Sequence, residues 1–228
     1  MKSPSELRIL LEAGATTALA YVADPSTVGA ALILGHGAGA GQRSTFMVDF
    51  ARAISSRGVD VITFNFPYTE QRRRIPDRAP VLEACYRAVI ASVHAALPAA
   101  KRALFIGGKS MGGRIATQVA AADPALPIAG LVLLGYPLHP PGRPTERRDK
   151  HLPEVGRPML FVQGARDAFG TPAELGPVVE TIGPLASIHV VAGGDHSLKL
   201  ARKDPAQAAA YDDIQLTIVE WIGMITNR

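Results

Sequence analysis

Three side chains in this sequence could together activate a hydroxyl group. Ser110 lies in the segment GKSMG at 108–112, which fits the pattern G-x-S-x-G. Asp167 and His196 follow later in the chain, each close to glycines. A serine becomes a nucleophile when a histidine takes its proton and an acid orients that histidine. The order serine, acid, histidine is one of the orders in which such sets occur, so the three residues predict nucleophilic catalysis.

The sequence around Ser110 predicts a strand, a sharp turn and a helix. Residues 103–107 (ALFIG) are apolar, and small or apolar residues recur at helical spacing over 115–120. A serine between such elements needs a backbone conformation that is costly for most residues, and the flanking glycines let strand and helix pack closely. Its hydroxyl would lie at a helix N-terminus, which favours negative charge. The alternative is a serine that only caps a helix.

Of the six histidines, His196 is best placed to serve as the base. It follows the last predicted strand on a glycine-rich loop, and the neighbouring Asp195 is too close in the chain to reach its ring. Asp167 follows the preceding predicted strand and would orient His196. The alternatives are a surface histidine, and an aspartate that pairs with Arg166 or caps a helix. The other histidines are expected in a helix, in a strand, beside the glycine loop or in a long polar loop: His94, His189, His36, His139 and His151.

Two backbone amides are candidates for an oxyanion hole, those of Met111 and Ala38. Met111 directly follows the candidate nucleophile, and Ala38 lies in the glycine-rich loop HGAGAG at 36–41. The small residues of this loop, Gly37 among them, would let a substrate carbonyl approach the backbone. A phosphate cradle is the rival interpretation, but the spacing G-x-x-x-x-G-K-S/T is not met.

The pattern of apolar runs predicts one α/β domain over residues 1–228. Strands alternate with helices, which favours a mostly parallel, twisted sheet with helices on both faces and a ligand site at the C-terminal ends of the strands. Strands are expected at Leu7–Leu11, Thr16–Ala23, Ala30–Leu34, Val59–Phe66, Ala103–Gly107, Ile128–Leu134, Met159–Gln163 and Ser187–Ala192. Helices are expected around Phe46–Ile54, over Val81–Leu97, after Gly112, after the capping box at Thr171, and from Asp204-Pro205 onward.

Composition indicates a globular protein with a sizeable core. The chain has 228 residues, of which 47% are hydrophobic and 19% charged, and its net charge is +4. The single cysteine excludes an intramolecular disulfide and a cysteine metal cluster. Charges in the first twelve residues leave no apolar core for a signal peptide, and no stretch predicts a membrane span. We expect a cytoplasmic monomer or homodimer that binds no nucleic acid, membrane, metal or cofactor.

At this point the chain resembles the small single-domain α/β-hydrolases of the dienelactone-hydrolase-like branch. The resemblance rests on GGKSMGGR at 107–114, on QGxRDxFG at 163–170 and on GGDHS at 193–197, and it extends from about Gly29 to Ile225. It implies the α/β-hydrolase fold with a minimal lid, Ser110 as nucleophile, His196 as base and Asp167 as its acid. Dienelactone hydrolases themselves carry cysteine where this chain has Ser110.

Two segments are candidates for shaping specificity. Residues 68–78 include Tyr68 and an arginine run containing Arg73, which would suit an anionic acyl group; a solvated basic loop is the alternative. Residues 137–158 are long, polar and proline-rich, and an insert there would be expected to cover the site.

Three functions follow from these observations. The first is hydrolysis of a carboxylic ester or thioester through an acyl-enzyme. The second is a non-catalytic interaction protein with a hydrolase fold, because some relatives in this branch act as binding subunits. The third is a cofactor-free perhydrolase or haloperoxidase that uses the same three residues.

Overall fold

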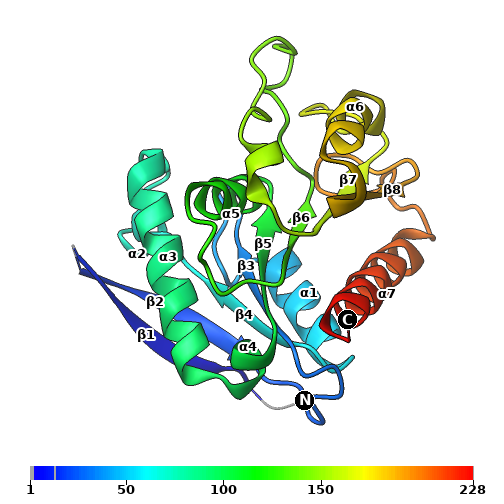
Figure 1. Ribbon diagram of the computed structural model, residues 1–228. Coiled ribbons are helices and arrows are strands. Elements are labelled where there is room, and N and C mark those ends of the chain that lie inside the picture. Colours follow the sequence, from blue (N-terminus) through cyan, green and yellow to red (C-terminus); the bar gives the residue numbers. More distant parts are fainter. Residues whose placement is uncertain (1–2, 13, 228) are drawn as a thin grey trace.

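The protein is described here by a computed structural model of residues 3–12 and 14–227. In this part of the chain, eight strands form one sheet in the order β1-β2-β4-β3-β5-β6-β7-β8 (Figure 1). β1 pairs antiparallel with β2, and β2 pairs antiparallel with β4, whereas all other neighbours are parallel. The strands are β1 (Ser5–Leu11), β2 (Gly14–Tyr21), β3 (Ala31–Gly35), β4 (Asp60–Phe64), β5 (Leu104–Lys109), β6 (Gly130–Leu134), β7 (Met159–Gly164) and β8 (Ala186–Val191).

Helices cover both faces of this sheet. The apolar side chains of α3, α5 and α6 join the core on one face, and those of α1 and α7 join it on the other. The α-helices are α1 (Thr45–Ser55), α2 (Pro67–Glu70), α3 (Ala79–Ala96), α4 (Pro98–Arg102), α5 (Met111–Ala122), α6 (Pro172–Ile182) and α7 (Gln207–Thr226), and the 3-10 helices are η1 (Leu152–Val155) and η2 (Gly183–Leu185). The predicted mostly parallel sheet between two helical layers is confirmed.

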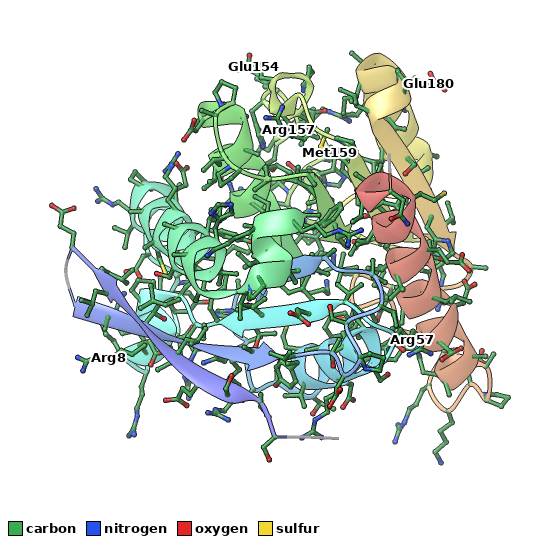
Figure 2. The ribbon with its side chains drawn as sticks, turned by 60° about the horizontal axis from the view of Figure 1, so that its bottom comes forward. Arg8, Arg57, Glu154, Arg157, Met159 and Glu180 are labelled. Atoms are coloured by element: carbon green, nitrogen blue, oxygen red, sulfur yellow. The ribbon has the colours of Figure 1, made fainter. Side chains whose placement is uncertain are left out.

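The central strands owe their position to continuous apolar sequence. β3, β4 and β6 are buried along their whole length, as strands covered on both faces must be. The predicted capping box also forms: the Thr171 side chain accepts from the amide of Glu174, whose carboxylate accepts from the amide of Thr171. On the face of the sheet that α1 and α7 cover, Figure 2 shows Arg57 beside helix α7, where its guanidinium donates to Asp212.

The sequence-based prediction was wrong for several connecting segments. Residues 67–80, for which no helix or strand was predicted, contain α2 and the start of α3, since Pro67 occupies a first-turn position where its fixed φ suits a helix. Helix α4 was not expected. The last helix begins at Gln207 rather than at Asp204, whose carboxylate instead accepts from the amide of Ala206. None of the described helices is long and apolar enough to cross a bilayer.

Candidate active site

Ser110 occupies a strained turn between β5 and α5. Its φ of 50° and ψ of −113° lie outside the regions that side-chain-bearing residues favour. Gly108 and Gly112 make the turn possible, because a Cβ at either position would lie 2.2 Å from the carbonyl oxygen of Gly35. The Ser110 amide donates to the Leu134 carbonyl oxygen at 2.9 Å, which ties the turn to β6. The predicted strand–turn–helix therefore forms with Ser110 at its apex.

The structure brings Ser110, His196 and Asp167 together in one chain of hydrogen bonds. The hydroxyl of Ser110 lies 2.8 Å from Nε2 of His196. On the other side of the ring, Nδ1 lies 2.9 Å from both carboxylate oxygens of Asp167. An ionised carboxylate only accepts, so Nδ1 carries the proton and Nε2 is free to accept from the hydroxyl. This tautomer is the one that a general base needs.

Asp167 is buried, and its charge is compensated by donors. Its side chain is 0% exposed. The side-chain amide of Gln163 donates to Oδ2 at 2.9 Å, and the backbone amide of Phe169 donates to Oδ1 at 2.8 Å. Together with His196 these donors replace the water that burial removes. The alternative in which Asp167 pairs with Arg166 does not occur, because the Arg166 guanidinium donates to the Gly193 carbonyl oxygen.

The loop that carries His196 is shaped by its own hydrogen bonds and by an aromatic contact. The carboxylate of Asp195 accepts from the amides of Ser197 at 2.7 Å and Lys199 at 2.9 Å, and it does not bond the imidazole, as the sequence predicted. The ring of Phe169 stacks on His196 with centroids 4.0 Å apart. The imidazole is thus held between Asp167, Phe169 and Ser110 rather than free at the surface.

The two candidate oxyanion amides flank Ser110. Neither the Ala38 nor the Met111 amide donates a hydrogen bond within residues 3–12 and 14–227; Met111 is the first residue of α5, where helix amides have no internal partner. Gly37 packs against the nucleophile, since a Cβ there would lie 3.6 Å from Cβ of Ser110. Small residues in this loop thus leave both amides beside the hydroxyl.

His36 orients the Gly37–Ala38 peptide. Its Nε2 accepts from the amide of Phe66 at 3.2 Å, so Nδ1 carries the proton and donates to the carbonyl oxygen of Gly37 at 2.9 Å. The carbonyl of Gly37 and the amide of Ala38 belong to one planar trans peptide and point in opposite directions. Fixing the carbonyl therefore fixes the amide. Burial lowers the pKa of His36, which keeps the ring neutral, as this pair of bonds requires.

A cavity of about 360 Å³ opens at Ser110. Its lining includes Gly37, Ala38, Ser110 and His196, with Phe46, Met47 and Phe169 as an apolar wall. Tyr68 and Arg73 are not brought into this cavity. They border a separate depression of about 560 Å³, which shares Ala40 and Ser44 with it.

Burial limits the access of a ligand to Tyr68, and hydrogen bonds to neighbouring side chains engage Arg73. Tyr68 is 1% exposed, and burial raises the pKa of its hydroxyl. The guanidinium of Arg73 donates to Asp77 at 2.5 Å and to Gln71 at 2.8 Å. A role in substrate binding stays a prediction for both, and it concerns only a ligand that extends past Ala40.

The segment 137–158 does not line the cavity at Ser110. Its tip, residues 141–147, is exposed and projects at the top of Figure 1. It is anchored elsewhere: His151 Nε2 lies 2.8 Å from the hydroxyl of Thr117 on α5, and Arg157, labelled in Figure 2, donates to the Pro124 carbonyl oxygen at 2.9 Å. The expectation that this segment covers the site was wrong, because none of the residues that line the cavity at Ser110 belongs to it.

Sequence reasoning missed three residues that shape the site. Gln163 is a buried amide near the end of the apolar strand β7. A polar residue in such a strand could have indicated a buried hydrogen-bonding role. Phe169 lies two residues after Asp167 and was given only as part of a motif. Lys109 was likewise given only as part of a motif, although its ammonium donates to the backbone carbonyl of His196. Within residues 3–12 and 14–227, no group of three His, Cys, Asp or Glu side chains is arranged to hold a metal.

The strand order, and a serine turn that meets a histidine and an acid from later strands, define an α/β-hydrolase fold. The chain belongs to the alpha/beta hydrolase domain family, whose model matches residues 28–223. The resemblance to small hydrolases of this fold is therefore confirmed.

Solved structures with the same fold cover nearly the whole chain. A serine hydrolase without a lid from Xanthomonas campestris is 19% identical, with a TM-score of 0.72 over 96% of this chain and 94% of its own. A dienelactone hydrolase from Anabaena variabilis is 17% identical, with a TM-score of 0.74 over 96% and 97%. An esterase domain from Rhodothermus marinus is 13% identical, with a TM-score of 0.73 over 98% and 99%. At these identities the likeness concerns the fold.

Proposed function

We propose that this protein is a serine hydrolase that cleaves carboxylic esters or thioesters through an acyl-enzyme. The observation that carries the proposal is the hydrogen-bond chain from Ser110 through His196 to Asp167, with distances of 2.8 and 2.9 Å. A serine that merely caps a helix needs no histidine, and a surface histidine needs no buried acid. Membership of the hydrolase family supports the same conclusion.

The geometry supports a two-step mechanism. Oγ of Ser110 attacks the substrate carbonyl carbon while Nε2 of His196 takes the hydroxyl proton, and the carboxylate of Asp167 stabilises the imidazolium. The amides of Ala38 and Met111 donate to the oxyanion that develops. The alcohol or thiol leaves with the proton from His196. Water then repeats the attack on the acyl-serine, with His196 again as base, and releases the acid.

The cavity favours a substrate whose group next to the carbonyl is apolar. Phe46, Met47 and Phe169 supply the apolar surface beside Ser110. A small-molecule ester is the expected partner, and an anionic group would have to reach the neighbouring depression bordered by Arg73. A cytoplasmic location and a monomeric or homodimeric state stay predictions.

A fluorophosphonate probe tests the proposal, because it reacts covalently with activated serines. We expect wild type and Ser56→Ala to be labelled and Ser110→Ala to remain unlabelled; Ser56 is an exposed serine at the end of α1. A panel of p-nitrophenyl esters then reports turnover. An unlabelled wild type would favour the non-catalytic alternative. Equal labelling of Ser110→Ala would place the nucleophile elsewhere. Peroxide-dependent halogenation without ester turnover would favour the perhydrolase.

A further inference from the structure

Lys109 connects the strand that carries Ser110 with the loop that carries His196. It is the last residue of β5 and directly precedes Ser110, so its backbone shares the fixed position of the turn. Its ammonium group donates a hydrogen bond to the backbone carbonyl of His196. One residue is therefore covalently linked to the candidate nucleophile and hydrogen-bonded to the main chain of the candidate base.

We propose that Lys109 is a positioning residue: its ammonium group fixes the His196 main chain so that the imidazole stays in line with Ser110, and activity falls when the ammonium loses its proton. This inference rests on the proposed hydrolase function. It goes beyond it by assigning a task, and a pH dependence, to a side chain that performs no step of the reaction itself.

The backbone around the Lys109 ammonium leaves a space in which this group fits. Gly135, at the end of β6, has a φ of 60°. A Cβ there would lie 2.7 Å from the carbonyl oxygen of His196, 2.9 Å from Nζ of Lys109 and 3.6 Å from Oδ2 of Asp167. Three polar groups thus converge where Gly135 lacks a side chain. Almost any other residue would push the ammonium away from His196.

The other hydrogen bonds of the His196 loop join it to segments other than the β5 turn. Asp195 bonds amides of its own loop, and the Arg166 side chain joins Gly193 to the turn that carries Asp167. These bonds set the loop against β7. Among the described residues, the hydrogen bonds between the β5 turn and this loop are the Lys109 bond and the Ser110–His196 bond itself. Lys109 therefore adds a restraint on the main chain of His196 that joins it to the β5 turn while the serine is being acylated.

A charged group at this place has a cost. Burial lowers the pKa of Lys109 to about 8, although the carboxylates of Asp167 and Asp195, which face it from the loops after β7 and β8, act in the opposite direction. A methionine of similar length would avoid the desolvation of an ammonium. Perturbed groups that stay charged beside a reaction centre are typically there for function. Above about pH 8 the neutral amine donates a weaker hydrogen bond, because the bond is no longer charge-assisted.

The experiment compares wild type with Lys109→Met and with the matched control Lys101→Met, an exposed lysine on α4. Hydrolysis of p-nitrophenyl acetate is followed from about pH 6 to about pH 10. We expect Lys109→Met to lower kcat about tenfold to a hundredfold at neutral pH, with little change in KM. In wild type and the control, kcat declines above about pH 8, whereas in Lys109→Met this decline disappears.

Two measurements separate positioning from a structural role and do not need turnover. Thermal unfolding should show Lys109→Met with a Tm close to that of wild type, because the removed desolvation cost of the ammonium offsets the lost bond to the His196 carbonyl. Hydrogen exchange should be faster by about tenfold or more at the amides of Gly194, Asp195 and Leu198, which are bonded within the loop, and unchanged elsewhere. Lys101→Met should match wild type in both.

The outcomes are distinct from those of the proposed function. If Lys109→Met matches the control in kcat, pH profile and loop exchange, the inference is overturned. It is also overturned if the variant loses stability and exchanges faster throughout, since that result indicates a structural role. If wild type hydrolyses no ester and is not labelled at Ser110, the proposed function fails; loop exchange alone then decides whether Lys109 restrains His196.

Discussion

Gln163 is the residue whose replacement tests the architecture beneath the site most directly. It is 0% exposed. Its side-chain oxygen accepts from the amide of Tyr136 at 2.8 Å, and its nitrogen donates to Asp167 at 2.9 Å and to the Gly170 carbonyl oxygen at 2.7 Å. Methionine has a similar length but can make none of these bonds. Gln163→Met therefore removes one side chain that serves three segments at once.

The expected loss can be worked from the partners left behind. Within the described part of the chain, the Tyr136 amide and the Gly170 carbonyl have no other hydrogen-bond partner, and each buried unsatisfied group costs about 1–3 kcal/mol. Asp167 keeps His196 and Phe169 as donors, so it contributes less. We expect the free energy of unfolding to fall by about 2–6 kcal/mol, which corresponds to about 4–24 °C in Tm for a chain of this size.

Urea unfolding followed by Trp221 fluorescence measures this loss. Trp221 is the single tryptophan, and its ring packs edge-on against Phe105 with centroids 5.7 Å apart, so its emission reports the core. Gln118→Met is the matched control, because Gln118 is half-buried on α5 and accepts one long bond of 3.4 Å from Arg114. A difference between the two variants below about 1 kcal/mol would refute the reasoning about buried polar groups.

Two further changes test the turn at Ser110 and the contacts that attach α2 to β2. Gly112→Ala should lower the free energy of unfolding by about 2–4 kcal/mol, since its Cβ would lie 2.2 Å from the Gly35 carbonyl oxygen, whereas Gly176→Ala, with nothing within 4 Å, should raise it by about 0.5–1 kcal/mol in thermal unfolding. Burial raises the pKa of Glu70, but hydrogen bonds from Thr17, Asn65 and Thr16 outweigh this effect. The pKa of Glu70 is therefore held below its ordinary value of 4.5. Its stabilisation is therefore present above that pH and lost as pH falls through the lowered pKa, so the advantage of wild type over Glu70→Gln in acid titrations should vanish there; a constant difference would contradict it.

The parts of the fold that could be predicted from the sequence are those in which a local pattern of apolar residues indicates the type of element. Continuous apolar runs identify β3 and β6 because strands covered on both faces carry no polar positions. The three residues of the candidate site could be found because each follows such a run. Helix α2 could not be found, because four residues carry no helical period and its existence depends on Pro67 and on the contacts of Glu70 with β2.

The contacts that complete the site depend on long-range geometry, so the sequence alone does not reveal them. Lys109 is adjacent to Ser110, yet nothing local indicates that its ammonium reaches the carbonyl of His196 on the loop after β8. Arg73 has a local partner that the sequence analysis did not name, since its guanidinium pairs with Asp77; a role for Arg73 in binding an anionic group stays a prediction. Residue type predicts what a side chain can bind, and the fold decides what it meets.

The sheet order explains why these contacts must be long-range. β5, β6, β7 and β8 are consecutive in the sheet and parallel. Ser110 follows β5, Asp167 follows β7 and His196 follows β8, so β6 lies between the nucleophile and its acid. Gly135 directly follows β6, and a side chain there would collide with the carbonyl of His196 and the ammonium of Lys109. The ammonium of Lys109 donates to the carbonyl of His196 above the end of β6, where Gly135 leaves room for both groups. This contact therefore joins the loop after β8 to the turn after β5, although two strands separate them in the sheet.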